Sequence, residues 1–168
     1  MIYHMLFALT LISALGCGLV AGIFFAFSSF VMGALGRIPP AAGIAAMQAV
    51  NVEVFNPWFM GAFFGTASTC IVLAIAALVL WTQTAAVWLL IGSVLYVAGS
   101  ILVTMLCNVP LNNALAQASP DSAEGAGLWS RYLTRWTQWN HVRTVASLAA
   151  AASQTVALYL QAGGLEPG

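Results

Sequence analysis

The stretch from Val54 to Pro120 contains no Asp, Glu, Lys or Arg. A charged side chain at the centre of a bilayer costs about 2.5 to 3.5 kcal/mol, so a long uncharged stretch is typical of membrane-spanning segments. This stretch is too long for one helix of about 20 residues, and the polar sequence Trp81–Thr84 interrupts it once. It therefore predicts two spans joined by a short hairpin.

Two further apolar stretches, Ile2–Leu35 and Val142–Leu160, complete a prediction of four spans. The composition agrees, because 62% of the 168 residues are hydrophobic and only 5% are charged, whereas a soluble domain has about 25% charged residues. The first stretch is too long for a signal peptide and has no basic residue before it, so we expect it in the mature protein.

We predict an all-α integral membrane four-helix bundle, with one four-span domain over residues 1–162 and a disordered tail over residues 163–168. Pro39 and Pro40 favour the start of a short interfacial helix after span one, which bends into span two near Asn56 and Pro57. An aromatic-rich helix leads into span four. Paired glycines at 18 and 22 and at 61 and 65 suit close helix contact and permit a homo-oligomer.

The basic residues predict the orientation of the spans. All four lie in or beside the loops that follow span one and precede span four: Arg37, Arg131, Arg135 and Arg143. The positive-inside rule places both loops in the cytoplasm and both termini outside. Abundant alanine with no lysine suggests a GC-rich bacterial genome, and we expect the protein in a bacterial inner membrane. His4 and His141 then lie on opposite sides, so they form no joint metal site. The net charge of zero does not favour binding to nucleic acid. Membrane lipids are the expected partners.

One face of the last helix carries polar and aromatic residues. At 100° per residue they form a continuous stripe, with Trp139 on its edge: Trp129, Tyr132, Trp136, Asn140, Arg143, Ser147, Ala150, Gln154, Ala157 and Gln161. Such residues turn toward the interior of a membrane bundle, where they find partners. The stripe is either a packed seam between helices or the wall of a site, and its aromatic row is either an interfacial belt or a flat surface for a planar ligand.

Polar residues from three helix ends gather at one depth, the cytoplasmic boundary: Asn51, Glu53, Asn56, Asn108, Asn112, Asn113, Asn140, His141 and Arg143. Arg143 is the natural counter-ion for Glu53, in either a structural or a functional pair. Asn108 and Asn112 either line a site or satisfy the backbone that Pro110 interrupts. His141 lies about 120° from Trp129 on an unbroken helix, away from the Arg143 stripe.

Four sequence strings together resemble the anthrone oxygenase-like family of small bacterial and fungal membrane proteins. They are FAFSSFVM at 25–32, MQAVNVEVFNP at 47–57, NVPLNNAL at 108–115, and the aromatic row from Trp129 to Trp139 followed by NHVRT at 140–144. The resemblance covers nearly the whole chain, and it implies a membrane oxidoreductase that oxidises a planar phenolic or anthrone-type molecule with O₂.

The resemblance also implies roles for individual residues. An anthrone has a methylene that is acidic through its enol, so a base generates a carbanion that reacts with O₂ without metal or flavin. The slot for the planar substrate would be formed by Tyr132, Trp136, Trp139 and Asn56. Donors to the developing oxyanion would be Asn108, Asn112, Asn140 and Arg143. The base would be His141, or alternatively Glu53.

No Rossmann, P-loop, haem or zinc motif occurs in the sequence, so we expect no cofactor and no metal. Two other interpretations remain open. The chain is alternatively a non-catalytic membrane subunit, or a lipid- or quinone-binding module of an assembly, with the tryptophans as a belt. A third interpretation is a redox module that binds a quinone or a metal through His141 and Glu53.

Overall fold

The computed structural model describes residues 2–79 and 84–163, which are almost entirely helical. The first arm comprises α1 (Ile2–Ala26), the π-helical segment η1 (Phe27–Val31) and α2 (Met32–Leu35). The second comprises α3 (Pro40–Glu53) and α4 (Pro57–Val79). The third comprises α5 (Thr84–Tyr96), the π-helical segments η2 (Val97–Leu102) and η3 (Thr104–Asn108), and α6 (Val109–Ala116), and the fourth is α7 (Ala123–Gly163). The described residues contain no strand, which confirms the all-α prediction.

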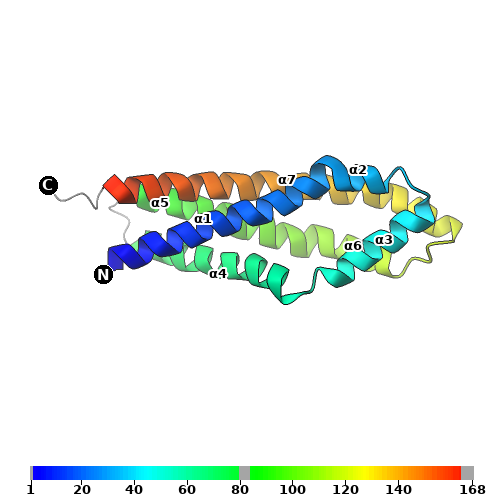
Figure 1. Cartoon of the computed structure of the whole chain (residues 1–168), viewed down its shortest axis with the longest axis horizontal. Coiled ribbons are helices and arrows are strands. Elements are labelled where there is room, and N and C mark those ends of the chain that lie inside the picture. The colour runs from blue at the N-terminus through cyan, green and yellow to red at the C-terminus, as the bar shows by residue number, and fades with distance from the viewer. Residues whose placement is uncertain (1, 80–83, 164–168) are drawn as a thin grey trace.

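The arms run alternately up and down as a four-helix bundle (Figure 1). Both ends of the chain lie at one end of the bundle, and the α2–α3 and α6–α7 connections lie at the other, called the loop end below. α7 packs along both α1 and α5, and α4 closes the bundle against the same two helices. The hairpin expected at Trp81–Thr84 falls largely on residues 80–83, which lie outside the described residues. Of the tail expected at 163–168, Gly163 is the last residue of α7 and the rest lies outside the described residues.

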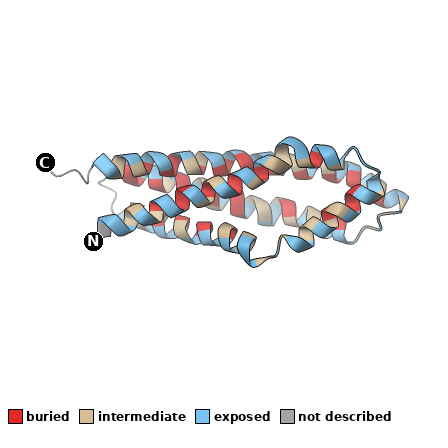
Figure 2. Cartoon of the chain, viewed as in Figure 1, coloured by how far each residue is buried: buried red, intermediate tan, exposed pale blue. Residues whose placement is uncertain are grey.

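Four helices are long and apolar enough to cross a membrane: Tyr3–Leu35, Pro57–Val79, Thr84–Ala116 and Ala123–Gly163. Within the most apolar window of each, only 33% to 39% of the residues are buried inside the bundle. Figure 2 shows the buried residues on the inward faces and exposed residues around the outside. Because these outward residues are mostly apolar, lipid is the solvent that suits the exterior. The prediction of an integral membrane bundle is confirmed.

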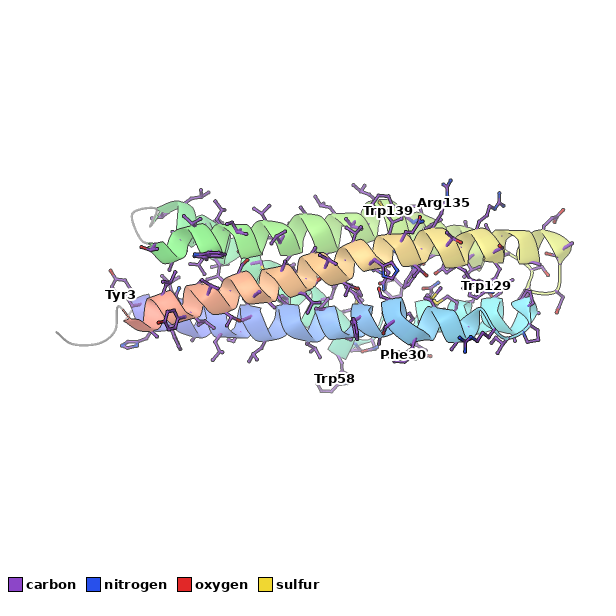
Figure 3. All side chains as sticks on the ribbon, turned by 90° about the horizontal axis from the view of Figure 1, so that it is seen from above. Tyr3, Phe30, Trp58, Trp129, Arg135 and Trp139 are labelled. Carbon is purple, nitrogen blue, oxygen red and sulfur yellow. The ribbon has the colours of Figure 1, made fainter. Side chains whose placement is uncertain are left out.

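The bundle is longer than a bilayer is thick. α4, with 23 residues, is about 35 Å long and matches the hydrocarbon core of about 30 Å, whereas α7, with 41 residues, is about 60 Å long. Large aromatic side chains project outward at the level where α4 begins, namely Trp58, Phe30 and Trp139 (Figure 3). Such belts mark the boundary between lipid and water. At this length α7 does not fit wholly within the hydrocarbon core.

The second arm breaks at residues 54–56, at this same boundary. Asn56 caps the new helix, because its Oδ1 accepts a hydrogen bond of 2.9 Å from the Phe59 amide, and Pro57 occupies the first helical position. The Asn56 amide nitrogen donates to the Glu53 carbonyl at 2.8 Å and ties the end of α3 to the start of α4. The bend near Asn56 and Pro57 is thus where the sequence predicts it. α3 runs along the bundle and packs against α6 and α7 (Figure 1).

The loop-end half has its own core, formed by Met32, Ile44, Met47, Leu115, Trp129, Tyr132 and Trp136. We refer to this cluster as the loop-end core. Gly43 of α3 lets the backbone approach Trp129, since a Cβ at this position would stand 2.8 Å from the indole ring. Gln48 fastens α3 to the end of α6 by donating to the carbonyls of Leu115 and Ala118 at 2.8 and 3.0 Å.

Four glycines expected in close helix contacts do not make them with the part of the chain that the structure describes: Gly18, Gly22, Gly61 and Gly65 have none of its atoms within 4 Å of where a Cβ would stand. The close approaches occur at other glycines. A Cβ on Gly16 would collide with Thr66 of α4, and one on Gly99 would collide with Ala146 of α7. Spacing alone misplaced these contacts because it does not give the direction in which a helix face points.

Candidate functional site

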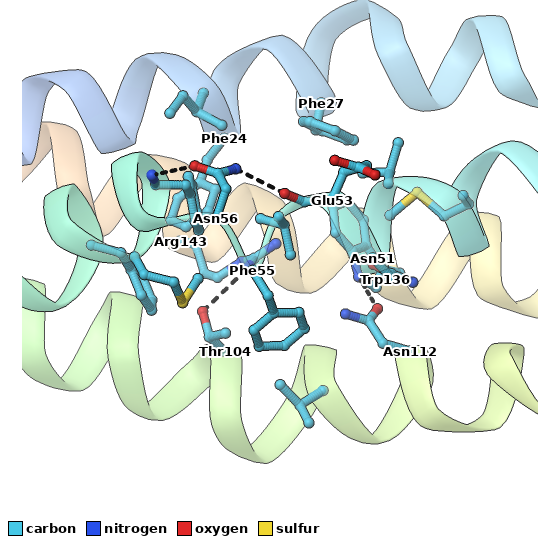
Figure 4. Close-up of a pocket in the computed structure, with 18 of the residues that line it drawn as sticks. Phe24, Phe27, Asn51, Glu53, Phe55, Asn56, Thr104, Asn112, Trp136 and Arg143 are labelled. Atoms are coloured by element: carbon cyan, nitrogen blue, oxygen red, sulfur yellow. Dashed lines mark hydrogen bonds between the residues drawn. The ribbon is translucent and has the colours of Figure 1, made fainter.

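A cavity of about 400 Å³ lies beside the break between α3 and α4 (Figure 4). Most of its wall is apolar, and the aromatic members are Phe24, Phe27, Phe55, Phe59, Phe63, Phe64 and Trp136. The polar members are Asn51, Glu53, Asn56, Thr104, Asn112 and Arg143. All four arms contribute, and the volume falls in the range of about 300 to 1,000 Å³ that is usual for small-molecule sites.

Arg143 supplies a buried cation to this wall. Its side chain is only 5% exposed, and its terminal nitrogens donate to Thr104 Oγ1 at 3.1 Å and to Asn140 Oδ1 at 2.6 Å. The guanidinium carbon lies 4.2 Å from the Phe24 ring centroid and 5.1 Å from that of Trp136, within the range of cation–π attraction. Nε is buried with no hydrogen-bond partner among the described residues, so the group retains donor capacity.

The interpretation of Glu53 as the counter-ion of Arg143 is not supported by the geometry. Both residues line the cavity, but within the described part of the chain no ion pair joins them, and the Glu53 side chain is exposed. The buried charge is instead held by neutral acceptors and aromatic faces. The site therefore presents a cation and a carboxylate that do not neutralise each other at contact distance.

Asn140 positions the Arg143 guanidinium by accepting one of its hydrogen bonds. Besides accepting from Arg143, it donates through Nδ2 to the Phe24 carbonyl and to Ser28 Oγ, both at 2.7 Å. Phe24 lies in the last turn of α1, and Ser28 lies in η1, where the first arm adopts π-helical geometry. Asn140 is fully buried and outside the cavity lining. Of the predicted donors, it thus contacts Arg143 rather than the cavity.

Asn112 is oriented by two hydrogen bonds from α7. Its Oδ1 accepts from the Tyr132 hydroxyl and from Trp136 Nε1, both at 2.8 Å. Since the amide oxygen is committed to these donors, the amide nitrogen is directed toward the cavity that Asn112 lines (Figure 4). Asn51 of α3 lies near Trp136 and Asn112 (Figure 4), and its Nδ2 is buried without a partner among the described residues. The wall thus contains two buried donors without a partner, Asn51 Nδ2 and Arg143 Nε, and the Asn112 amide nitrogen faces the cavity.

The aromatic row of α7 divides into two parts. Trp129 and Tyr132 are stacked with centroids 5.6 Å apart and an interplanar angle of 15°, and Tyr132 and Trp136 with 6.0 Å and 21°. Of these three buried rings, only Trp136 reaches the cavity, where it meets Phe27 at 5.7 Å. Trp139 is 41% exposed and points outward (Figure 3). The row therefore does not form one flat wall for a ligand: Trp129 and Tyr132 pack in the loop-end core, Trp136 lines the cavity, and Trp139 faces outward.

Two other predicted site residues lie away from the cavity. His141 is exposed and is not part of the lining, because α7 is an unbroken helix that keeps it on the opposite face from Arg143. Asn108 is buried and donates to the Trp136 carbonyl at 3.2 Å, which links η3 to α7. Neither His141 nor Asn108 lies among the polar residues that line the cavity.

Several lining residues were not among the sequence candidates, above all Asn51, Thr104 and the phenylalanines of α1 and α4. Asn51 belongs to the polar cluster at the boundary and to one of the family-like strings, so a signal for it exists in the sequence. Phe59 and Phe63 are stacked at 5.7 Å one helical turn apart, but in an apolar helix nothing marks them as facing a cavity. Among the described residues, no group of three or more His, Cys, Asp or Glu side chains is placed to hold a metal ion.

Comparison with known proteins gives one match. The sequence model of a family described as "Anthrone oxygenase" matches residues 55–153, which is more than half of the chain. This region runs from the break before α4 into α7 and includes Asn112, Trp136, Asn140 and Arg143, whereas Asn51 and Glu53 lie just before it. No curated protein and no solved structure matches the chain.

Proposed function

The chain belongs to the anthrone oxygenase family, and from this premise we propose that it is a membrane oxidoreductase that oxidises a planar phenolic or anthrone-type molecule with O₂. The cavity beside the α3–α4 break is the proposed site. The observation that carries the proposal is the pairing of a buried, donor-rich Arg143 with an aromatic slot and a separate carboxylate on the same wall.

The proposed reaction starts with a proton transfer. A base removes a proton from the methylene carbon of the anthrone, and the negative charge is delocalised onto the carbonyl oxygen as an enolate. The carbanion carbon reduces O₂ and forms a C–O bond, which after protonation gives a hydroperoxide. Loss of water then converts this carbon to the second carbonyl of the quinone. One anthrone and one O₂ thus give one anthraquinone and one water, and the electron-rich carbanion supplies the electrons, so the proposed reaction uses no cofactor.

The residues on the wall match these needs. The enolate oxygen accepts hydrogen bonds from Arg143, Asn112 and Asn51, which act as an oxyanion site. In an anthrone the methylene lies across the central ring from the carbonyl. A substrate whose oxygen is held at the buried Arg143 therefore directs its methylene toward the more exposed side, where Glu53 lies. This assigns the base to Glu53 and the ring contacts to Trp136 and Phe27.

The orientation in the membrane is part of the proposal. Arg37, Arg131 and Arg135 lie toward the loop end, and the positive-inside rule places this end in the cytoplasm of a bacterial inner membrane, with the termini outside. The site then lies at the cytoplasmic boundary of the bilayer.

The test is O₂ consumption together with quinone absorbance, measured on detergent-purified, metal-analysed protein supplied with emodin anthrone. Because anthrones autoxidise, heat-inactivated protein and the Arg143→Gln variant are the references. We expect turnover above both, with a loss of about 100- to 1,000-fold in the variant, the usual effect of removing one oxyanion donor. A rate equal to the heat-inactivated control would reject the proposed activity.

A second candidate is a lipid- or quinone-binding module without catalysis. It is favoured by the exposed apolar side chains at the edge of the cavity, Phe55, Phe64 and Met105. This candidate predicts stoichiometric binding of an anthraquinone or lipid with no turnover, and both are measured in the same experiment. A role as a subunit of a membrane assembly predicts copurifying protein instead.

A further inference from the structure

We propose that the cavity opens sideways into the bilayer, so that its ligand is a lipophilic, uncharged aromatic molecule taken up directly from the membrane. The identity of this ligand as a planar ketone or phenol rests on the proposed function, but the sideways opening does not. Three observations carry the inference: the residues at the mouth of the cavity, their depth, and the packing that closes the loop-end side.

The mouth is formed by lining residues that are also exposed. Phe55 is 74% exposed, Met105 57% and Phe64 50%. We call these three the lip. They come from the α3–α4 break, from η3 and from α4, so the cavity reaches the surface between the second and third arms. The surface around the lip is equally apolar, since Trp58 is 88% and Leu106 72% exposed.

The lip lies at a depth where lipid is present. Phe64 lies seven residues inside α4, about 10 Å along the helix from its start at the aromatic belt. Met105, in η3, lies eight residues, about 12 Å, closer to the middle of the third apolar span than Asn113, which lies near the loop end of that span. A mouth of aromatic and thioether side chains suits acyl chains, and the exposed ionisable side chain among the lining residues is Glu53, at the end of α3.

The loop-end side of the cavity is closed by packed side chains. Met47 and Trp136 line the cavity and also belong to the loop-end core, whose remaining members are all at most 3% exposed. Gln48 and the stacked aromatic row of α7 fix this core between α3, α6 and α7. A ligand arriving along the bundle axis from the water at the loop end therefore meets a filled interior, whereas the lip leads to the cavity from the side.

This arrangement defines the class of ligand. The acceptor oxygen points inward to Arg143 and Asn112, and the hydrophobic part of the molecule lies toward the lip. Glu53 beside the mouth disfavours carboxylates and sulfates through like-charge repulsion. Uncharged polycyclic ketones and phenols that partition into lipid fit, and glycosides or other water-soluble conjugates do not.

The first arm of the test asks whether the lip faces lipid. A nitroxide is attached at Met105→Cys, in a chain whose own three cysteines are replaced, and the protein is reconstituted in phosphatidylglycerol and phosphatidylethanolamine vesicles. Its relaxation by O₂, which concentrates in lipid, is compared with that by a water-soluble nickel chelate, using Asn113→Cys, on the exposed side of α6, as the aqueous reference. We expect O₂ to dominate at 105 and nickel at 113. Nickel access at 105 equal to that at 113 would overturn the proposal.

The second arm asks whether the ligand passes the lip. Met105→Trp narrows the mouth, and Leu106→Trp is the matched control, since Leu106 is exposed beside it but does not line the cavity. We expect the association rate of an anthraquinone with the proteoliposomes to fall about tenfold in Met105→Trp and to be unchanged in Leu106→Trp. Equal rates in the two variants would overturn the lateral route. Binding of the anthraquinone without turnover would reject the proposed catalysis but not the lateral route of entry. The nitroxide result depends neither on binding nor on turnover.

Discussion

At the scale of single residues, two candidates for the base occupy different environments. Both side chains are exposed, but Glu53 lines the cavity, whereas His141 lies on the opposite side of α7 from Arg143 and does not line it. The two residues are both ionisable and both near the boundary, so residue type alone does not separate them. Their positions do, because a base acts only within hydrogen-bond reach of the proton that it removes.

We therefore predict that Glu53→Gln lowers the rate of quinone formation by about 100-fold or more, the usual contribution of general-base catalysis. His141→Gln is the matched control, with the same new side chain outside the cavity, and its rate should stay within about twofold of wild type. Initial rates of quinone absorbance in proteoliposomes make the comparison. A large loss in His141→Gln with wild-type activity in Glu53→Gln would return the base to His141.

Asn112 allows a second test at this scale. Asn112→Leu leaves the Tyr132 hydroxyl and the Trp136 indole N–H without their shared acceptor, at a cost of about 1 to 3 kcal/mol for each buried group. The neighbouring Asn113→Leu, on the exposed side of α6, should change stability by less than about 0.5 kcal/mol. Thermal unfolding in detergent, followed by tryptophan fluorescence, measures both. Equal melting temperatures for the two variants would contradict the role given to Asn112.

The inward face of α7 is the part of the site that the sequence predicts best. Trp129, Tyr132, Trp136, Asn140 and Arg143 are all buried, as their spacing indicates, because residues on one helix have a fixed angular relation. The same relation indicated that His141 faces away. Asn51 and the phenylalanines of the wall could not be predicted in this way, since they come from other arms whose rotation is set by tertiary packing.

At the scale of elements, the break in the second arm creates the cavity wall. Asn56 uses both ends of its amide there, one to cap α4 and one to hold the end of α3. It was predicted as a substrate-binding residue, and although it lines the cavity, both of its polar groups serve the turn. Its contribution to the site is therefore the position that it gives to Asn51 and Glu53.

Asn56→Ala should lower the free energy of unfolding by about 0.5 to 2 kcal/mol, the usual cost of losing a helix N-cap. Asn56→Ser keeps a capping oxygen and should recover most of this loss. Thermal unfolding in detergent compares the two variants with wild type. If alanine and serine destabilise the protein equally, capping is not the function of this side chain.

The helix type inside the arms was not predictable. η1 and η3 contribute Phe27, Thr104 and Met105 to the cavity, and π-helical turns are often found at functional sites. Hydrophobic periodicity indicates a helix in these stretches. It does not distinguish the i→i+5 backbone hydrogen bonds of a π-helix from the i→i+4 hydrogen bonds of an α-helix. A side chain that contacts the backbone beside η1 comes from a different arm: Asn140 of α7 donates a hydrogen bond to the Phe24 carbonyl.

At the scale of the whole molecule, charge and length place the chain in the membrane. The uncharged stretch from Val54 to Pro120 and the four apolar helices predicted the number of spans and the class of fold. The continuous stripe from Trp129 to Gln161 indicated one long helix, and α7 extends it to 41 residues, from Ala123 to Gly163. Its length exceeds the thickness of the hydrocarbon core, and in the proposed orientation the site lies at the boundary of the bilayer.

The proposed orientation gives a prediction at this scale. A fusion of alkaline phosphatase, which folds only outside the cytoplasm, to the C-terminus should be active, and the same enzyme inserted in the α6–α7 connection should be inactive. The physical reason is the arginine bias toward the loop end. Active insertions in the connection together with inactive C-terminal fusions would invert the orientation, while the bundle and its cavity would be unchanged.

The most direct test of the central claim is an experimental structure of the protein with a bound anthraquinone, the product of the proposed reaction. We predict the quinone beside Trp136, with one carbonyl oxygen within hydrogen-bond distance of Arg143 and Asn112 and the opposite carbonyl toward Glu53 and the lip. A quinone bound elsewhere, for example on the outer face of Trp139 while lipid fills the cavity, would contradict it.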